Sequence, residues 1–334
     1  MIEQMMIKDV VAEAPISSIN GIPFKEADYL SAPDAPSAGC LRREAVDIFK
    51  HFIGQDLIAK ANYTTDFMGG ITSETVSEVV VPHCNSIQKF PIPGNWHGDT
   101  LEWMGTLKSA LDGKYRYRMA ELGAGWAPWC AIAGRAAKMR GLDDIRLFAV
   151  EGHAGNVALA NKHLAENGMS ESQFLVRQAI VGAQDGTAEF PKHVSMSHDY
   201  GAVALFSGQA DRSAFDHFVK YRPPELELES MPCLSLKTVI DHFDGDILDL
   251  IHCDVQGTEE ALFDSDGLEL MSKTVRRVVV AAHSYDIERI LVRNFGRANW
   301  ECEGLHSTIM REDELGEIFL MVDGCQVWRN PHLD

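Results

Sequence analysis

The sequence predicts an α/β fold built on a mostly parallel β-sheet with helices on both faces. Three observations support this prediction. From residue 115 onward, short apolar segments alternate with segments of helical periodicity. The apolar segments are nearly continuous, as expected for parallel strands buried on both sides. Finally, strand-like segments at 300–306 and 317–327, joined by an acidic turn, predict an antiparallel pair at the end of the chain.

The alternation begins with a strand at 115–122 and ends with a helix at 285–296. In an open sheet of this kind, ligands bind at the carboxyl ends of the strands, near the point where the strand order reverses. The elements between these two are expected as helix 126–140, strand 145–151, helix 153–167, strand 173–181, helix 235–243, strand 247–255, helix 258–271 and strand 276–283.

A smaller region precedes this alternation. Four prolines interrupt residues 1–40, which predicts an extended arm. Apolar residues at helical spacing predict an amphipathic helix at 41–61, which is expected to pack on the main domain or on a second subunit of a homo-oligomer. We therefore divide the chain into an N-terminal arm and accessory region, 1–98, and a main domain, 99–334.

Shorter features connect the amphipathic helix to the main domain. Asp99 or Thr100 provides an N-cap for a helix, with an acidic residue three positions after Asp99. Trp96, His97 and Thr100 are candidates for closing a ligand pocket. The expected elements are a turn-rich loop at 62–73, a strand at 78–81 ended by Pro82, and a helix at 101–111.

Charge and cysteine content argue against several classes of protein. The 334 residues include 30 Lys and Arg against 49 Asp and Glu, a net charge of -19, so a broad surface for nucleic acid is not expected. Seven cysteines occur without a Cys-x-x-Cys pair, which indicates a reducing compartment and no structural zinc. No apolar run approaches the roughly 18 residues of a membrane span. We expect a cytoplasmic protein that binds neither nucleic acid nor membrane.

Gly123 and Gly125 stand where the first expected strand turns into a helix. Glycine lets a ligand approach the main chain closely, and the helix N-terminus beyond it favours negative charge. The next strand ends at Glu151, 26 residues after Gly125, where a carboxylate can accept hydrogen bonds from both ribose hydroxyls. Pro128 occupies the place of the third glycine of a dinucleotide site, which disfavours an NAD-dependent oxidoreductase. The corner predicts an adenosine-containing cofactor without a pyrophosphate.

Three elements in order carry a family resemblance. Glu-Leu-Gly-Ala-Gly at 121–125, Val-Glu-Gly-His at 150–153 and Asp-Val-Gln-Gly-Thr-Glu at 254–259 resemble the FkbM family of class I S-adenosylmethionine-dependent methyltransferases. The third element is the most specific, and the resemblance covers roughly 118–305. It implies a Rossmann-like, mostly parallel seven-stranded sheet with an antiparallel terminal strand, a smaller N-terminal α/β extension, and S-adenosyl-L-methionine as cofactor.

The resemblance also implies which residues hold the cofactor. Glu121, at the end of the first strand, would face the methionyl ammonium, and Glu151 would bind the ribose. Gln178 and Ala179 would lie near the adenine. The remaining expected cofactor residues are Gly123, Gly125, Trp126, Gly152 and Asp254.

Methyl transfer from a sulfonium is an in-line displacement, so the protein must orient the acceptor and exclude water. A hydroxyl acceptor also benefits from a base. His252 and Asp254 lie at the end of the fourth strand, and His283 ends the fifth. We predict His283 as the base, with Asp254 as its orienting partner or as the clamp for the acceptor. His252 is a further catalytic candidate, and Glu259 is the reserve carboxylate.

A metal site is an alternative for the same residues. Imidazole and carboxylate suit several divalent ions, so His252, Asp254 and His283 together have suitable chemistry. Some sugar O-methyltransferases use a magnesium ion, but they group acidic ligands rather than two imidazoles and one carboxylate. No metal is therefore expected here.

The resemblance implies an O-methyltransferase that acts on a hydroxyl of a small-molecule, sugar, glycan or natural-product acceptor. N- or carboxyl-methylation of a peptide or metabolite, which needs no His283 base, is one alternative. A non-catalytic assembly protein that keeps the cofactor-binding sheet is another.

Residues 191–232 interrupt the alternation and predict a lid. Such a lid would recognise a polyhydroxylated acceptor. Its candidate residues are His193, His198, Tyr200, Asp211, Arg212, His217 and Arg222.

Overall fold

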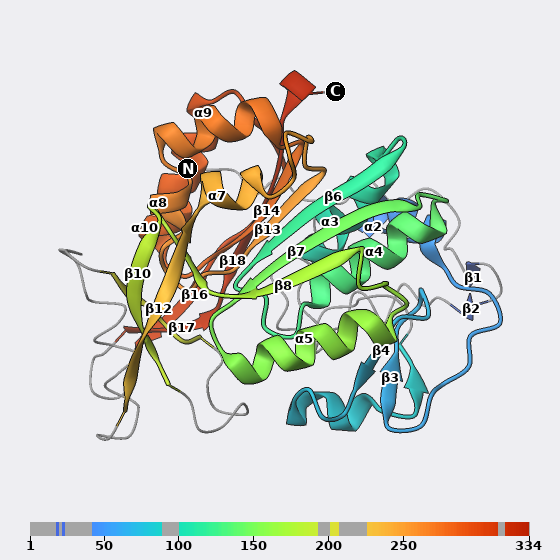
Figure 1. Ribbon diagram of the computed structural model, residues 1–334. Coiled ribbons are helices and arrows are strands. Elements are labelled where there is room, and N and C mark those ends of the chain that lie inside the picture. Colours follow the sequence, from blue (N-terminus) through green and yellow to red (C-terminus); the bar gives the residue numbers. More distant parts are fainter. Residues whose placement is uncertain are drawn as a thin grey trace.

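The computed structural model describes residues 18–19, 22–23, 42–88, 100–192, 201–206, 226–312 and 318–333. A seven-stranded sheet forms its centre (Figure 1), in the order β15-β18-β14-β13-β6-β7-β8. β18 runs antiparallel to both neighbours, β14 and β15, and the other neighbouring pairs are parallel. The strands are β6 (Arg116–Leu122), β7 (Asp144–Glu151), β8 (Phe174–Gln178), β13 (Leu250–Cys253), β14 (Arg277–Ala282), β15 (Glu301–His306) and β18 (Gly324–Arg329).

This architecture confirms the predicted class I fold. The strand order reverses between β6 and β13, which lie side by side although 127 residues lie between Leu122 and Leu250 in the sequence. The last strand in the sequence, β18, is inserted between β14 and β15 and pairs antiparallel with β15. The single strand expected at 317–327 is divided between β17 (Ile318–Val322), which belongs to another sheet, and β18. Ligand binding is therefore expected where β6 and β13 end.

Helices cover both faces of the sheet. α3 (Thr100–Asp112), α4 (Pro128–Met139) and α5 (Ala154–Glu166) belong to one face, and α7 (Leu236–Asp241), α8 (Glu259–Leu262), α9 (Ser265–Thr274) and α10 (Tyr285–Arg297) to the other. Each face of the sheet has its own hydrophobic core. Because side chains alternate along a strand, Tyr117 and Met119 of β6 belong to the core beneath α3, α4 and α5, whereas Ala120 and Leu122 belong to the core on the opposite face.

A second sheet interrupts the alternation after β8. Its four strands have the order β11-β10-β12-β9, with bounds β9 (Ile180–Gly182), β10 (Gly186–Pro191), β11 (Leu205–Phe206) and β12 (Leu228–Ser235). The strand expected at 173–181 is thus two strands of different sheets, separated at Ala179. The described part of the expected lid 191–232 contributes β11 and the start of β12. A hairpin of β16 (Ile309–Glu312) and β17 (Ile318–Val322) precedes β18.

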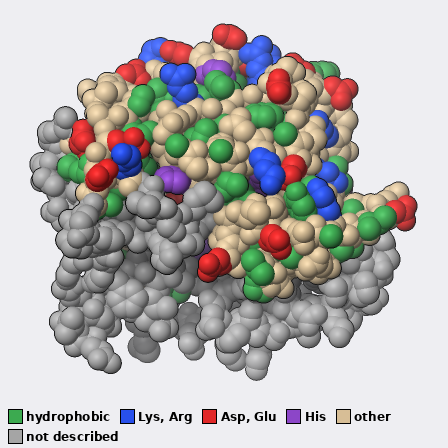
Figure 2. All heavy atoms as spheres, turned by 60° about the horizontal axis from the view of Figure 1, so that its bottom comes forward, with side chains coloured by type: hydrophobic (Ala, Val, Ile, Leu, Met, Phe, Trp, Pro, Cys, Tyr) green, Lys and Arg blue, Asp and Glu red, His purple; other side chains and the backbone are tan. Residues whose placement is uncertain are grey.

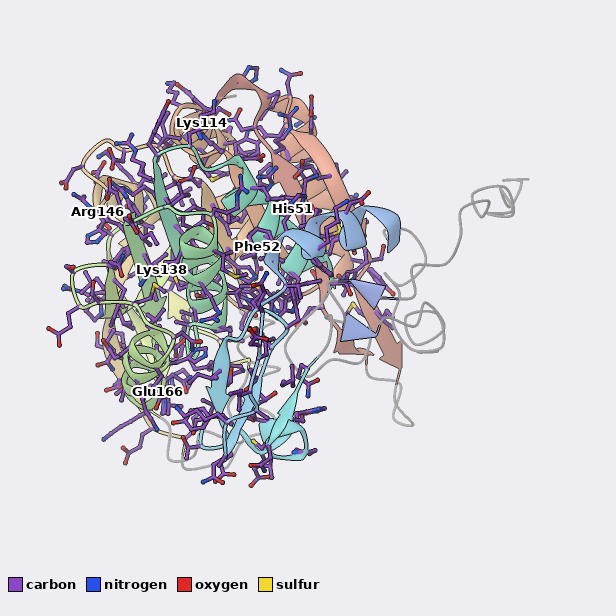
Figure 3. The ribbon with its side chains drawn as sticks, turned by 90° about the vertical axis from the view of Figure 1, so that its right-hand side faces the viewer. His51, Phe52, Lys114, Lys138, Arg146 and Glu166 are labelled. Atoms are coloured by element: carbon purple, nitrogen blue, oxygen red, sulfur yellow. The ribbon has the colours of Figure 1, made fainter. Side chains whose placement is uncertain are left out.

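The described N-terminal residues pack on the main domain and share its core. Phe49, Phe52 and Phe67 belong to the same buried cluster as Trp103 of α3, and Phe52, labelled in Figure 3, is fully buried. The Tyr63 hydroxyl donates a 2.7 Å hydrogen bond to Glu166 at the end of α5. The elements are β1 (Ser18–Ile19), β2 (Ile22–Pro23), α2 (Arg42–Phe49), η1 (Lys50–Phe52), β3 (Tyr63–Thr65), β4 (Ile71–Ser73), η2 (Glu78–His83) and β5 (Ser86–Ile87).

Three local predictions in this region were wrong. The helix expected at 41–61 ends by residue 52, because Ile53 is extended and the amide of Gly54 pairs with Phe67 instead. The expected loop 62–73 is a β-hairpin. Asp66 stabilises its turn by accepting hydrogen bonds from the amides of Met68 and Gly70. The expected strand 78–81 is the 3-10 helix η2, with Pro82 inside it.

The surface mixes both signs of charge. Figure 2 shows Lys and Arg side chains interspersed with Asp and Glu on one face of the described residues, without a broad basic area on that face. Within the described ranges, no helix combines the length and apolarity needed to cross a membrane.

Candidate active site

The corner between β6 and α4 brings backbone amides to the carboxyl edge of the sheet. Gly123 and Gly125 have positive φ angles of 74° and 53°, and Ala127 follows at 55°. The amides of Gly123 and Ala124 donate to the carbonyl of Val150, which ties the corner to β7. A Cβ atom on Gly123 would stand 1.8 Å from the carbonyl oxygen of Asp254, so only glycine fits there. The two strand ends on either side of the order reversal are thus in direct contact.

Glu151 holds the second half of the corner. Its Oε2 accepts a 2.7 Å hydrogen bond from the amide of Gly125, and its Oε1 accepts one of 2.7 Å from the amide of His153. The side-chain amide of Asn156 donates to the same Oε1 at 3.3 Å. Burial raises the pKa of Glu151, and these donors oppose the shift. A carboxylate fixed by main-chain donors is pre-organised for a ligand.

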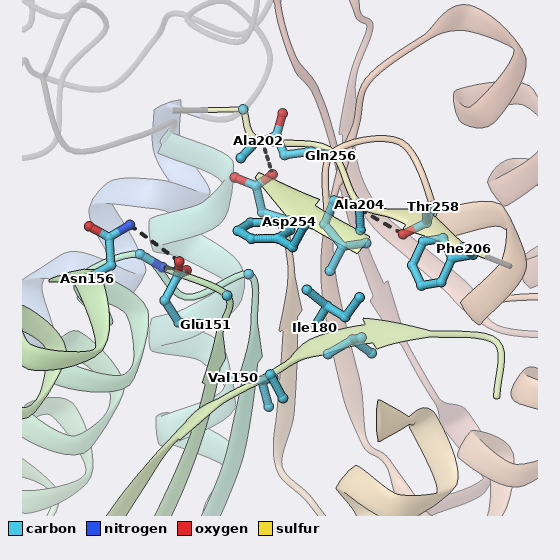
Figure 4. Close-up of a pocket in the computed structure, with 18 residues that line it drawn as sticks. Val150, Glu151, Asn156, Ile180, Ala202, Ala204, Phe206, Asp254, Gln256 and Thr258 are labelled. Carbon is cyan, nitrogen blue, oxygen red and sulfur yellow. Dashed lines mark hydrogen bonds between the residues drawn. The ribbon is translucent and has the colours of Figure 1, made fainter. Parts of the chain in front are cut away.

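A pocket opens between these elements, and Figure 4 shows its walls. Glu151 and Asp254 supply the acidic groups, while Ile180 and Phe206 of the second sheet, with the neighbouring Ala204, supply an apolar side. An apolar wall facing a few well-placed polar groups is typical of cofactor sites. The other lining residues are Gly123, Gly125, Val150, Gly152, Asn156, Ala179, Val181, Phe190, Gly201, Ala202, Val255, Gln256 and Thr258.

A histidine surrounded by carboxylates adjoins this pocket. His283 Nδ1 donates a 2.7 Å hydrogen bond to Glu259 Oε1, and the Glu259 side chain is fully buried. On the other side of the ring, His283 Nε2 lies 3.1 Å from Asp254 Oδ1 and 3.8 Å from Asp323 Oδ1. Gln256 donates a 2.7 Å hydrogen bond to Asp254 Oδ1. The pocket and this cluster therefore share Asp254.

Charge shifts the pKa values inside this cluster. Burial opposes a charge on His283, but the carboxylates of Glu259 and Asp254 outweigh burial and hold its pKa well above the usual value. Burial would raise the pKa of Asp254, yet the hydrogen bond and charge of His283 lower it. Burial and the neighbouring acids raise the pKa of Asp323 to about 6. The cluster has an excess of negative charge that a cation would stabilise.

Comparison with known proteins supports a single family. A protein of Jannaschia sp. (strain CCS1), described as "Putative methyltransferase", is 30% identical over 283 residues, which cover 84% of this chain and 97% of that protein. The chain belongs to this methyltransferase family. No family model matches the methyltransferase sequence.

Solved structures give weaker likenesses. The precorrin-6Y C5,15-methyltransferase of Geobacter metallireducens is 12% identical, covering 69% of this chain and 86% of that one, with a TM-score of 0.34. The C-terminal domain of the Rhodobacter capsulatus precorrin-6Y C5,15-methyltransferase is 10% identical, covering 70% and 90%, with a TM-score of 0.36. The assignment of the methyltransferase fold therefore rests on the strand order and on the Jannaschia relative.

The structure brings most of the expected cofactor residues of the methyltransferase together. Six of them line the pocket: Gly123, Gly125, Glu151, Gly152, Ala179 and Asp254. Gln178 and Trp126 are not among the lining residues. Gln178 is exposed and donates to the carbonyl of Gly152, and the carbonyl of Trp126 contacts His163.

Glu121 does not take its expected place toward the methionyl ammonium. Its carboxylate is 1% exposed and accepts hydrogen bonds from the amides of Trp129, at 3.2 Å, and Cys130, at 2.6 Å. These amides belong to the first turn of α4, whose donors have no partner within the helix. Glu121 therefore stabilises the helix start beneath the glycine corner.

His252 is likewise absent from the pocket, contrary to its expected catalytic place. Its side chain is buried, its ring stacks on Trp129 with centroids 4.9 Å apart, and its Nε2 lies 3.1 Å from Glu102 Oε1. The side of β13 that carries His252 is covered by α3 and α4, so this ring cannot reach an acceptor at the pocket. Its contacts indicate a structural role.

Several site residues were not predicted. Gln256, whose φ is 58°, lies inside the Asp-Val-Gln-Gly-Thr-Glu element, so its signal was in the sequence. Phe206 and Asp323 gave no local signal, because tertiary structure alone brings them to the site. Trp96, His97 and the seven candidates of the expected lid (His193, His198, Tyr200, Asp211, Arg212, His217 and Arg222) lie outside the described residues.

Proposed function

We propose that this chain is an S-adenosylmethionine-dependent methyltransferase of the FkbM type that methylates a hydroxyl of a sugar, glycan or natural-product acceptor. One observation carries the proposal. A single pocket is lined both by Glu151, which suits a ribose, and by Asp254, which contacts His283. Methyl transfer needs this arrangement, because donor and acceptor must meet in line within one water-excluding site.

The lining residues fit an adenosyl group. A Cβ on Gly125 would meet nothing within 4 Å, so a ligand can approach the bare main chain. Glu151 can accept hydrogen bonds from ribose hydroxyls, and the apolar side formed by Ile180 and Phe206 suits an adenine ring. When bound, S-adenosylmethionine supplies the electrophilic methyl group.

Asp254 is the group placed to meet the acceptor. It lines the pocket with its side chain 35% exposed, so one of its oxygens can accept a hydrogen bond from an incoming hydroxyl. The proton that leaves this hydroxyl during attack passes to a carboxylate oxygen of Asp254, because the raised pKa of His283 keeps the imidazole protonated and unable to accept it. Glu259, rather than Asp254, orients the imidazole, through its contact with Nδ1. We therefore assign the acceptor clamp to Asp254 and the orienting role to Glu259.

Transfer of a labelled methyl group tests the proposal. The protein and labelled S-adenosylmethionine are incubated with matched sugars, amines and carboxylic acids, and label is followed into each class. We expect label in hydroxyl acceptors, and we expect Asp254→Asn to abolish transfer while S-adenosylhomocysteine still binds. Label found only in amines or carboxylates would contradict O-methylation.

A further inference from the structure

Gln256 has a backbone conformation that is costly for its residue type. Its φ angle is 58°, in the left-handed region that residues other than glycine rarely adopt. Such strain persists only where the surroundings fix it, and it is concentrated at functional sites. Gln256 also lines the pocket, next to Asp254 (Figure 4). Its side chain therefore calls for a role beyond the turn that it occupies.

Two neighbours fix the direction of the Gln256 side-chain amide. Nε2 donates a 2.7 Å hydrogen bond to Asp254 Oδ1. Oε1 faces the segment that leads into β11, where a Cβ atom on Gly201 would lie 3.3 Å from it. The reverse orientation of the amide would bring Oε1 against a charged carboxylate, which has no hydrogen to donate. Gln256 is therefore a donor to Asp254.

The two oxygens of the Asp254 carboxylate have different surroundings. Oδ1 accepts the hydrogen bond from Gln256 and lies 3.1 Å from His283 Nε2. Within the part of the chain that the structure describes, no hydrogen bond reaches Oδ2. The side chain is 35% exposed and lines the pocket. Oδ2 is thus the oxygen that remains for a ligand.

We propose that Gln256 is a positioning residue for methyl transfer, which holds Asp254 Oδ1 so that Oδ2 points to the acceptor hydroxyl. This inference rests on the proposed function, in which Asp254 contacts that hydroxyl and takes its proton. Proton transfer requires the base to lie within hydrogen-bond reach of the proton. Gln256 follows β13 and His283 follows β14, so two separate elements hold Oδ1 and restrict rotation of the carboxylate.

The same contacts keep Asp254 ready to accept a proton. Burial would raise the pKa of Asp254, but His283 and the hydrogen bond from Gln256 hold it below the usual value. A carboxylate must be ionised to act as a base. Gln256 therefore favours both the charge and the direction that the transfer needs.

Methyl transfer by variants at position 256 tests this role. Gln256→Met keeps the length of the side chain and removes the donor, whereas Gln256→Gly removes the side chain and the backbone strain. The substrates are labelled S-adenosylmethionine and the sugar that the wild type labels fastest. We expect kcat to fall at least about tenfold in both variants, because a hydrogen bond to a charged group is lost.

Stability separates this role from a purely structural one. Gln256→Gly should unfold at a urea concentration no lower than that of the wild type, because glycine adopts a positive φ without strain. Asn299→Gly is the matched control, since Asn299 is exposed and has the same φ of 58°. This control should keep the wild-type rate.

Titration of Asp254 measures the contact without any acceptor. The protein is made with ¹³C-labelled aspartate, and the Asp254 carboxyl signal is identified by its loss in Asp254→Asn. Its midpoint should lie at higher pH in Gln256→Met than in the wild type, because a donor to the charged form is gone. The other charged or titratable groups near Asp254 are the same in both proteins: Glu151, His252, Glu259, His283 and Asp323.

Three results would overturn the inference: a wild-type rate in Gln256→Met, an unchanged titration midpoint, or a parallel loss of rate and stability in Gln256→Gly. Failure of the proposed function would look different, because the wild type would then label no sugar. In that case a shifted midpoint would still support the contact between Gln256 and Asp254, and an unchanged midpoint would contradict it.

Discussion

The amide of Gly125 donates a 2.7 Å hydrogen bond to Glu151 Oε2, so the carboxylate that ends β7 is fixed against the glycine corner that follows β6. This contact joins two sequence elements 26 residues apart at one edge of the sheet. It also sets the direction in which Glu151 faces the pocket.

Glu151→Gln should weaken S-adenosylhomocysteine binding by about 10- to 100-fold, because hydrogen bonds to a charged group contribute about 1.5–3 kcal/mol. Calorimetric titration measures the change. Asn156→Ala removes only a 3.3 Å contact to the same carboxylate and should weaken binding much less. Equal affinity in Glu151→Gln and wild type would refute the ribose assignment.

Gly123→Ala should destabilise the fold severely. The added Cβ would lie 1.8 Å from the Asp254 carbonyl oxygen, and the φ of 74° already disfavours a side chain. Gly141→Ala is a matched control, because its φ of 76° is similar and nothing lies within 4 Å of the new Cβ. Urea unfolding should show a loss of about 1 kcal/mol for the control, from backbone strain alone, and a much larger loss at Gly123.

Glu121 should make stability depend on pH. Burial raises its pKa to about 7, and the charge of His252 and the amide donors only partly oppose this. The folded protein then binds the Glu121 proton more tightly than the unfolded chain does. Protonation of Glu121 therefore stabilises the fold fully below about pH 4.5, and this stabilisation is lost as the pH rises through 7. The shift corresponds to about 3 kcal/mol.

Glu121→Gln should remove that dependence. Urea unfolding at pH 5 and at pH 8 measures the free energy of unfolding of both proteins. Between these two pH values, the free energy of unfolding should fall more for the wild type than for the variant. Parallel pH profiles for the two proteins would show that Glu121 does not titrate in this window.

Glu259→Gln should lower methyl transfer at least about tenfold without changing the affinity for S-adenosylhomocysteine. The substitution keeps the shape but removes the charge that holds His283, and a hydrogen bond to a charged partner is worth about 1.5–3 kcal/mol. Steady-state rates and calorimetry measure the two quantities. An unchanged rate would show that the orientation of His283 does not matter.

Phe52→Ala tests whether the N-terminal region is part of the main core. Phe52 is fully buried in the cluster that contains Trp103 and Trp129, so the cavity should cost about 3–5 kcal/mol in a single unfolding transition. Ile58→Ala, at a side chain 84% exposed, should change stability by less than about 0.5 kcal/mol. A separate early transition for Phe52→Ala would indicate an independent N-terminal unit.

The sequence predicted the features that depend on local patterns. A nearly continuous apolar segment located β14, because a strand buried on both faces has no polar side to interrupt it. The glycine corner and Glu151 were predictable because backbone conformation and strand ends leave local signals. Asp254 was predicted from the element that carries the family resemblance.

Side-chain directions at the site were not predictable, because distant residues determine them. Glu121 turns to the first amides of α4, which the left-handed Ala127 brings within reach. His252 turns to Glu102, 150 residues away in the sequence. The break between β8 and β9 at Ala179 was also not predictable from the sequence. The residues on both sides of Ala179 suit a strand, and only pairing with the second sheet separates β9 from β8.

Calorimetric titration with S-adenosylhomocysteine, and separately with NAD, is the decisive measurement of which cofactor the pocket binds. We predict micromolar binding of S-adenosylhomocysteine to the wild type and no binding of NAD, because the corner has no third glycine for a pyrophosphate and Glu151 faces a pocket for one nucleoside. Binding of NAD alone, or of neither molecule, would contradict this prediction.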